Sequence, residues 1–104
     1  MILHRRIHKL RKDRFDEGVK IALEFNELAA RKLDKRGVVY QPAMAGAALS
    51  RNHIVIDTLH ASLAEMEQYF RSFGQLPEVK PLLARWNEVE EESWAENYVI
   101  IEPK

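Results

Sequence analysis

Cysteine is absent from the 104-residue chain. Disulfide bonds, thiolate metal sites and a cysteine nucleophile are therefore excluded. The absence fits a reducing compartment, and we expect a cytoplasmic protein. The first residues, Met1 to Arg6, become charged too early for a secretory signal peptide. No apolar run approaches the roughly 18 residues that a membrane span needs, so we expect no membrane partner.

An excess of charge of one sign is also absent, because 16 basic residues balance 16 acidic ones. Nucleic-acid binders normally carry a basic excess, since neutralising phosphates supplies most of their affinity. The basic cluster from Arg5 to Arg14 is local, and the segment from Glu88 to Glu92 is acidic. We therefore expect no nucleic-acid partner.

Linkers, internal repeats and low-complexity tracts are missing as well, so residues 1–104 are expected to form a single domain. The hydrophobic fraction is 46% and the charged fraction is 31%, which is ordinary for a folded globular protein. A chain of this length buries somewhat over about 60% of its unfolded surface, which is enough for one core.

The first third of the chain predicts a strand followed by a long helix. Residues 2–10 alternate in character, and a period of two is typical of a strand. Asp13 is expected to begin an amphipathic helix, whose apolar residues recur at three- and four-residue steps as far as Leu33. Gly37 follows a basic turn, as at the end of a helix.

The middle of the chain predicts two more strands. Val38 to Tyr40 begins an edge strand, because Pro42 cannot donate a ladder hydrogen bond. Residues 43–49 are alanine-rich, which favours a helix, but their position favours a strand, and we predict a strand. The run from His53 to Thr58 is rich in β-branched residues and predicts a central strand.

The last third predicts helices and a closing strand. Ser62 and Glu65 form a capping box that begins a second helix, which Gly74 ends. A further helical piece is expected to begin close to Pro81, and a final strand to cover 97–102. The resulting order is βαββαβ, an α+β arrangement of ferredoxin-like type. It has an antiparallel four-stranded sheet, helices on one face, and the first and third strands side by side.

The opening of the chain resembles NIPSNAP-like proteins. Residues 2–10, Ile-Leu-His-Arg-Arg-Ile-His-Lys-Leu, are followed by Phe15. In that family a hydrophobic–Glu–Leu–Arg strand, with an aromatic residue two positions on, leads through Pro-Gly into a helix. Arg6 stands at the position of the family's arginine. His4 replaces the glutamate, His8 replaces the aromatic residue, and Lys-Asp replaces Pro-Gly.

The whole chain is similar to the wider dimeric α/β-barrel superfamily, whose members pair two such sheets face to face. The resemblance implies a homodimer. The superfamily includes haem-degrading and quinol-type monooxygenases, isomerases and proteins of unknown activity, and a shared fold does not transfer a reaction. Haem-degrading members use an Asn, a Trp and a His at set places. The first strand here has no Asn, so those residue roles are not carried over. We expect no cofactor, with haem as a minor alternative.

A candidate site follows if His4 opposes Asp57 and His8 opposes His53. The apolar face of the sheet would then pack on the helices, and the polar face would look into the dimer. A His beside an Asp could act as an oriented acid–base, because the carboxylate fixes the imidazole tautomer. The catalytic candidates are His4, His53 and Asp57. The ligand-binding candidates are Arg6, His8, Val55, Trp94 and Tyr98.

Two plainer interpretations of these residues stay open. An antiparallel sheet often has one wet face, and Arg6 with Asp57 could form a salt bridge across a dimer. Trp86 falls on a helical stripe and is expected in the core, whereas Trp94 and Tyr98 fit a dimer contact or a pocket mouth. No metal site is expected, because His4 and His8 would lie about 13 Å apart on a strand.

Two functions are therefore compared. The first is a protein that binds a small aromatic or lipophilic molecule in a cavity at the sheet face. Its enzymatic form would be a monooxygenase or isomerase without cofactor. The second is a non-catalytic homodimerisation or interaction module. A connected pocket lined by His4, Arg6, His53 or Asp57 would favour the first, and a packed interface the second.

Overall fold

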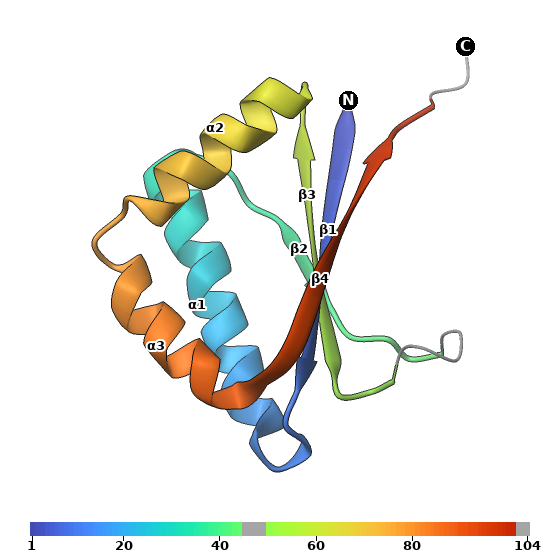
Figure 1. Cartoon of the computed structure of the whole chain (residues 1–104), viewed down its shortest axis with the longest axis vertical. Helices are drawn as coiled ribbons and strands as arrows, with labels where there is room; N and C mark the ends of the chain where they lie inside the picture. Colours follow the sequence, from blue (N-terminus) through green and yellow to red (C-terminus); the bar gives the residue numbers. More distant parts are fainter. Residues whose placement is uncertain (45–49, 102–104) are drawn as a thin grey trace.

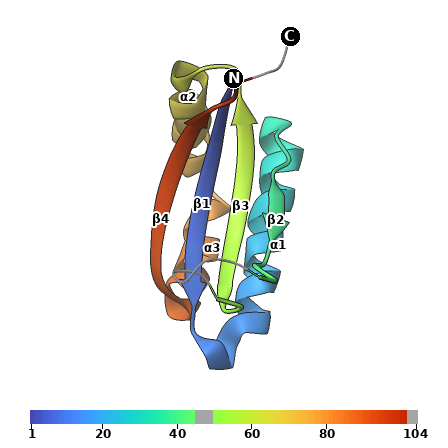
Figure 2. The same ribbon diagram turned by 90° about the vertical axis from the view of Figure 1, so that its right-hand side faces the viewer.

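The computed structural model describes residues 1–44 and 50–101 and shows one antiparallel sheet with three helices on one of its faces (Figure 1). The strands lie in the order β2-β3-β1-β4. Figure 2 shows the layer of helices behind the sheet. This arrangement confirms the predicted ferredoxin-like α+β fold, including the antiparallel pairing of the first and third strands. The elements are β1 (Ile2–Leu10), η1 (Lys12–Arg14), α1 (Phe15–Leu33), β2 (Val38–Tyr40), β3 (His53–His60), α2 (Leu63–Gly74), α3 (Val79–Val89) and β4 (Glu90–Val99).

Helix α1 begins and ends differently from the prediction. A 3-10 turn containing Asp13 precedes it, and Asp13 is not its N-cap. The helix ends at Leu33 and is capped by Asp34, which has a left-handed backbone (φ 51°) and donates its N–H to Ala29 O. Gly37 serves a close approach instead, because a Cβ there would lie 2.8 Å from Asp57 O. Asn26 fixes this glycine by hydrogen bonds to its N–H (2.8 Å) and its carbonyl (3.0 Å).

Strand β2 covers Val38–Tyr40 and lies at the edge of the sheet, as the nearby proline predicts. The strand predicted over 43–49 falls mostly on residues 45–49, which lie outside the described residues. Ala43 and Met44 belong to no strand. The edge strand is therefore short, and β3 carries most of this side of the sheet.

The capping box at the start of α2 is confirmed, because Ser62 Oγ accepts a hydrogen bond from the Glu65 N–H at 3.2 Å. Helix α3 begins at Val79, and Pro81 sits in its first turn, where a missing N–H costs nothing. Strand β4 begins at Glu90, directly after α3, and not at Asn97 as predicted. Exposed edge strands often carry charges. The acidic residues at the start of β4 therefore gave no apolar alternation from which a strand could be predicted.

The register that we predicted between β1 and β3 is wrong by one residue. His4 pairs with Thr58 and His8 pairs with Ile54. A slip of one residue moves every side chain of a strand to the other face. The physical reason lies at the ends of β1: Ile2 (8% exposed) and Leu10 (0%) are the buried anchors. The side chains that share their face, at positions 4, 6 and 8, therefore point toward the helices.

The core lies between the sheet and the helices at the Leu10 end of β1. Its central members are Leu10, Ile21, Ala22, Ile54, Trp86 and Val89. Trp86 is 4% exposed, which confirms its predicted place in the core. Gly18 brings α1 close to β1, because a Cβ there would lie 2.5 Å from Leu10 Cδ1. Within residues 1–44 and 50–101, no helix combines the length and the apolar character that crossing a membrane requires.

Candidate functional site

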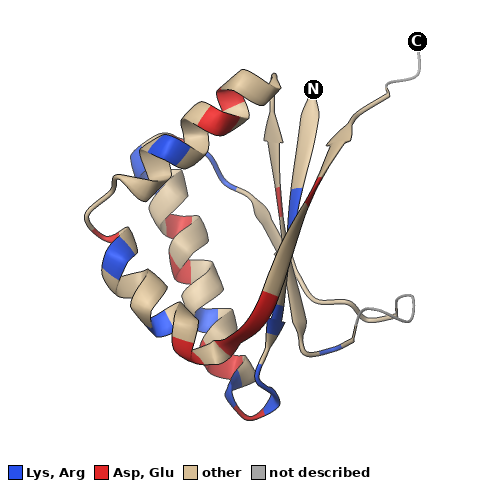
Figure 3. Ribbon diagram, viewed as in Figure 1, with Lys and Arg blue, Asp and Glu red and all other residues tan. Residues whose placement is uncertain are grey.

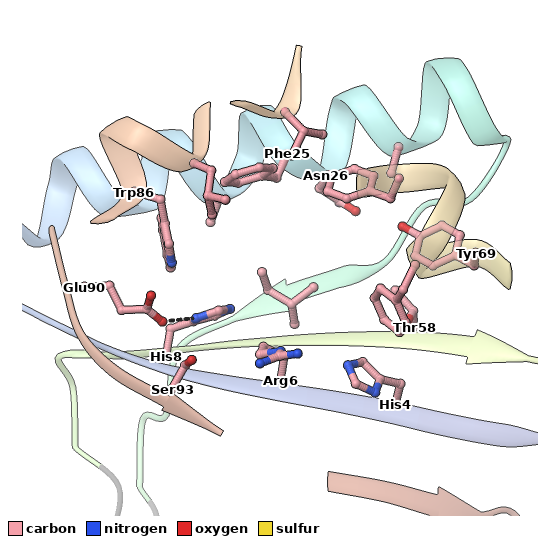
Figure 4. Close-up of a pocket in the computed structure, with 17 residues that line it drawn as sticks. His4, Arg6, His8, Phe25, Asn26, Thr58, Tyr69, Trp86, Glu90 and Ser93 are labelled. Carbon is pink, nitrogen blue, oxygen red and sulfur yellow. Dashed lines mark hydrogen bonds and ion pairs between the residues drawn. The ribbon is translucent and has the colours of Figure 1, made fainter. Parts of the chain in front are cut away.

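A cavity of about 390 Å³ lies between the sheet and all three helices. Its size is that of a small-molecule site. Five rings from the helices form its walls: Phe25, Tyr69, Phe70, Phe73 and Trp86. Its floor is a row of three alternate residues of β1, namely His4, Arg6 and His8 (Figure 4). The helix side of the cavity is thus mostly aromatic, and the sheet side is mostly polar.

His8 and Glu90 form an acid–base pair at one end of this floor. His8 Nδ1 lies 2.6 Å from Glu90 Oε1, and the two side chains are 13% and 17% exposed. Because the carboxylate accepts, Nδ1 carries the proton, and the other imidazole nitrogen of His8 points into the cavity (Figure 4). The edge of the Trp86 ring packs on the imidazole with centroids 4.8 Å apart.

Glu90 lies beside His8 because it stands at the junction of α3 and β4. This junction is acidic and lies beside the end of β1 (Figure 3), where Lys9 and Glu91 form a 3.5 Å ion pair. Burial alone would raise the pKa of Glu90, but the hydrogen bond and charge interaction with His8, together with Ser93 and Trp86, outweigh burial and lower that pKa. Glu90 therefore stays a carboxylate at neutral pH and keeps His8 oriented.

His4 lies at the opposite end of the floor and is 5% exposed. Its Nδ1 donates to Asn97 Oδ1 at 2.7 Å, and its ring packs on Phe70 with centroids 4.6 Å apart. Burial lowers the pKa of His4, although the bond to Asn97 opposes this. The imidazole is therefore neutral near pH 7. Its Nε2 is a buried acceptor that finds no partner in the described part of the chain.

The predicted site residues divide between the two faces of the sheet. The cavity brings together His4, Arg6 and His8. Five others lie with Arg5 and Ile7 on the face of the sheet that points away from the helices, called the open face below, although His53 and Val55 are buried there. Their positions in the register have the opposite parity: His53, Val55, Asp57, Trp94 and Tyr98. His4 and Asp57 therefore cannot form the acid–base pair that the assumed register suggested.

Asp57 has different partners from those we expected. It accepts hydrogen bonds from Arg5 Nε at 3.0 Å and Arg5 Nη2 at 3.1 Å. Tyr40 donates to it at 2.9 Å, and Arg5 also lies over the Tyr98 ring, 5.6 Å from the centroid. The salt bridge proposed between Arg6 and Asp57 is thus replaced by one from Arg5 within the same chain.

Sequence reasoning missed Glu90 and Asn97, the two residues that orient the histidines. Both belong to β4, and most of that strand was not predicted. The available signal was the position of Glu90 directly after the last apolar residue of a helical stripe. That signal could not give a partner, because it says nothing of how β4 pairs with β1.

The pH dependence of stability should follow from His4 and His60. Burial lowers the pKa of both below the ordinary 6.5. The charge of Arg6 adds to this lowering at His4, and those of Lys35 and His4 add to it at His60. His60 is 2% exposed, and its Nε2 lies 2.8 Å from Thr58 Oγ1. The unfolded chain therefore binds more protons than the folded one below pH of about 6.5. This contribution is intact above that pH and is lost as the pH falls toward the lowered folded values.

We accordingly expect the free energy of unfolding, measured by urea denaturation, to decrease between about pH 7 and about pH 5. A His4→Gln, His60→Gln variant should show a shallower decrease over the same interval. Equal slopes for the two proteins would contradict this assignment.

Known structures share this fold. No protein-family model and no curated protein matches the chain. A NIPSNAP family protein from Agrobacterium tumefaciens is 13% identical, with a TM-score of 0.82 over 97% of this chain and 93% of that one. An uncharacterised NIPSNAP domain protein from Burkholderia xenovorans is 13% identical, with a TM-score of 0.80 over 97% and 95%. A protein from Nitrosomonas europaea, named as a proposed antibiotic biosynthesis monooxygenase, is 10% identical, with a TM-score of 0.74 over 98% and 100%.

These similarities define the class of the molecule by its fold alone. It has the ferredoxin-like α/β fold that NIPSNAP domain proteins and antibiotic biosynthesis monooxygenase-like proteins share. The resemblance seen in residues 2–15 is therefore confirmed at the level of the fold. Within the described residues, no group of three His, Asp or Glu side chains is placed to hold a metal ion.

Proposed function

We propose that this protein binds a small aromatic or lipophilic molecule in the cavity between the sheet and the helices. The observation that carries the proposal is a cavity of about 390 Å³ lined by five aromatic rings, with most of its polar groups on the floor and two, Asn26 and the Tyr69 hydroxyl, on the helix side. Rings give apolar contact area, and a few polar groups fix the orientation of a ligand.

The pair of His8 and Glu90 suggests what the protein does to that molecule. Isomerisation and cofactor-free oxygenation both begin when an acidic C–H or O–H group loses its proton. The free Nε2 of His8 is the proton acceptor in this proposal, and Glu90 stabilises the imidazolium that forms. We keep His4 as a second group of the site and assign His53 and Asp57 to the open face.

Haem, the minor alternative to having no cofactor, does not fit this cavity. The guanidinium of Arg6 lies on the floor between the two imidazoles (Figure 4). A charged group in that place would meet the apolar face of a macrocycle, and burying a charge there without a partner is unfavourable. We derive no step through haem.

Binding can be tested with N-phenyl-1-naphthylamine, an uncharged aromatic molecule whose fluorescence rises in apolar surroundings. We expect saturable binding to the wild type. Ser93→Trp should weaken it at least about tenfold, which corresponds to about 1.4 kcal/mol, because Ser93 lines the cavity. Glu91→Trp is the matched control two positions along β4 and should bind as the wild type does. Absence of saturable binding, or equal weakening by both variants, would refute the proposal.

A homodimer formed through the open face of the sheet is a second part of the proposal. Three exposed apolar side chains surround the network of Arg5, Asp57 and Tyr40 on that face: Val38, Leu59 and Tyr98. Exposed apolar groups that cluster on one face mark interaction sites. The charged groups among them are already paired within the chain, so a second copy could cover them without leaving a charge unpaired. A pure dimerisation module would use this face and leave the cavity without a role.

A further inference from the structure

Arg6 differs from the other basic residues in where it lies. It is half-buried on the floor of the cavity, in the middle of the central strand. Its strand neighbours are Ile56 on β3 and Ala95 on β4, neither of which offers a polar side chain. Lysines and arginines elsewhere in the described chain are exposed, pair with a carboxylate or, as Lys35 does with Leu59, donate to a backbone carbonyl. Arg5, one position away, is held by Asp57 at 3.0 Å.

Arg6 makes no ion pair or hydrogen bond with any side chain in the described ranges. The carboxylate that shares the cavity is Glu90, and it is turned to His8 at 2.6 Å (Figure 4). His4 is neutral near pH 7, because burial lowers its pKa. The floor therefore presents a guanidinium without a directed counterion, among aromatic walls.

A guanidinium in such surroundings has a definite chemical preference. It stays charged at every physiological pH, and its planar fork matches the two oxygens of a carboxylate. Charge-assisted bidentate hydrogen bonds of this kind are roughly twice as strong as neutral ones. An arginine left unpaired in an apolar cavity costs free energy that a ligand anion would recover.

We propose that the molecule bound in the cavity is an aromatic carboxylate and that Arg6 binds its carboxylate group. This inference rests on the proposed function, since it names the chemistry of the ligand for the same cavity. The ring of the ligand packs between the aromatic walls, and its carboxylate lies on the floor between the two histidines. Arg6 is the residue that selects an acid over an uncharged molecule of the same shape.

A pair of probes of nearly equal shape tests the inference on the whole protein. 2-Naphthoate carries the carboxylate, and 2-acetylnaphthalene replaces it with an uncharged methyl ketone. Dissociation constants measured by isothermal titration calorimetry should favour the acid at least about tenfold in the wild type. Raising the ionic strength should reduce this ratio, because salt screens the charge interaction.

Three arginine variants separate the effect of Arg6 from that of the general charge of the chain. Arg6→Met should bring the acid-to-ketone ratio to about one while the ketone still binds, and Arg6→Lys should restore part of the preference. Arg5→Gln removes the same charge one position away, on the other face, and should leave the ratio unchanged.

The outcomes distinguish the two proposals. Equal binding of the two probes by the wild type would overturn the role of Arg6 and leave the cavity function intact. Saturable binding of neither probe nor of N-phenyl-1-naphthylamine would overturn both. The acid-to-ketone ratio of the wild type and its salt dependence test the role of Arg6 even if Arg6→Met does not fold.

Discussion

Replacing Trp86 by alanine is expected to lower the free energy of unfolding by about 3–5 kcal/mol. The indole is 4% exposed and belongs to the central core cluster. It packs edge-on against Phe25 with centroids 6.3 Å apart and against His8 at 4.8 Å. Its removal would leave a cavity that the rigid sheet and two helices can fill only in part. The loss approaches the whole stability of many small domains, about 5–15 kcal/mol.

Urea denaturation followed by circular dichroism measures this effect. Trp86→Phe is the matched variant, because it keeps an aromatic ring beside Phe25 and His8, and it should be clearly less destabilised. The alanine variant should also show a mobile His8 ring by NMR, since the indole is one of the two groups that hold the imidazole. A loss below about 1 kcal/mol for alanine would contradict the assigned role of Trp86 in the core.

Leu59→Glu is expected to dissociate the proposed homodimer. Leu59 is 46% exposed on the open face, where it pairs with Leu3 across the strands. In a dimer built on this face, the new carboxylate would be buried in the interface, which is costly. Light scattering at micromolar concentration should give twice the 12.1 kDa chain mass for the wild type and a mass near the single chain for the variant.

The control for this experiment is Leu23→Glu. Leu23 is 51% exposed on α1, so it matches Leu59 in residue type and exposure but lies in the helix layer. It should remain dimeric. A wild-type mass of 12.1 kDa would remove the dimer from the proposal. Dissociation by both variants would place the interface elsewhere.

The helices were the most predictable part of the fold. Their apolar stripes and the Ser62 cap are local signals, and the structure confirms α1 and α2 within a few residues. The face of β1 was not predictable from its own pattern. Leu3 and Ile7 alternate as well as Ile2 and Leu10 do, and the choice depends on which pair the helices cover. A basic residue at position 6 also did not indicate that its side chain lies on the face that the helices cover.

The site was predictable in its residue types and not in its pairing. His4, Arg6 and His8 were identified, and a histidine oriented by a carboxylate was expected. The structure contains such a pair, but the carboxylate is Glu90 and not Asp57. Contacts between residues 82 positions apart depend on the register of β1 with β4. No local pattern contains that information.

The central place of β1 also determines when the cavity can form during folding. β1 lies between β3 and β4, so the beginning of the chain must pair with its final strand. Such non-local pairing requires closure of a long loop first, and it makes folding slow. During synthesis, His4 and His8 are made before Glu90 and Asn97. Until then one edge of β1 is open to pairing with other chains. We therefore expect the two imidazoles to become oriented in the last steps of folding, together with the docking of β4.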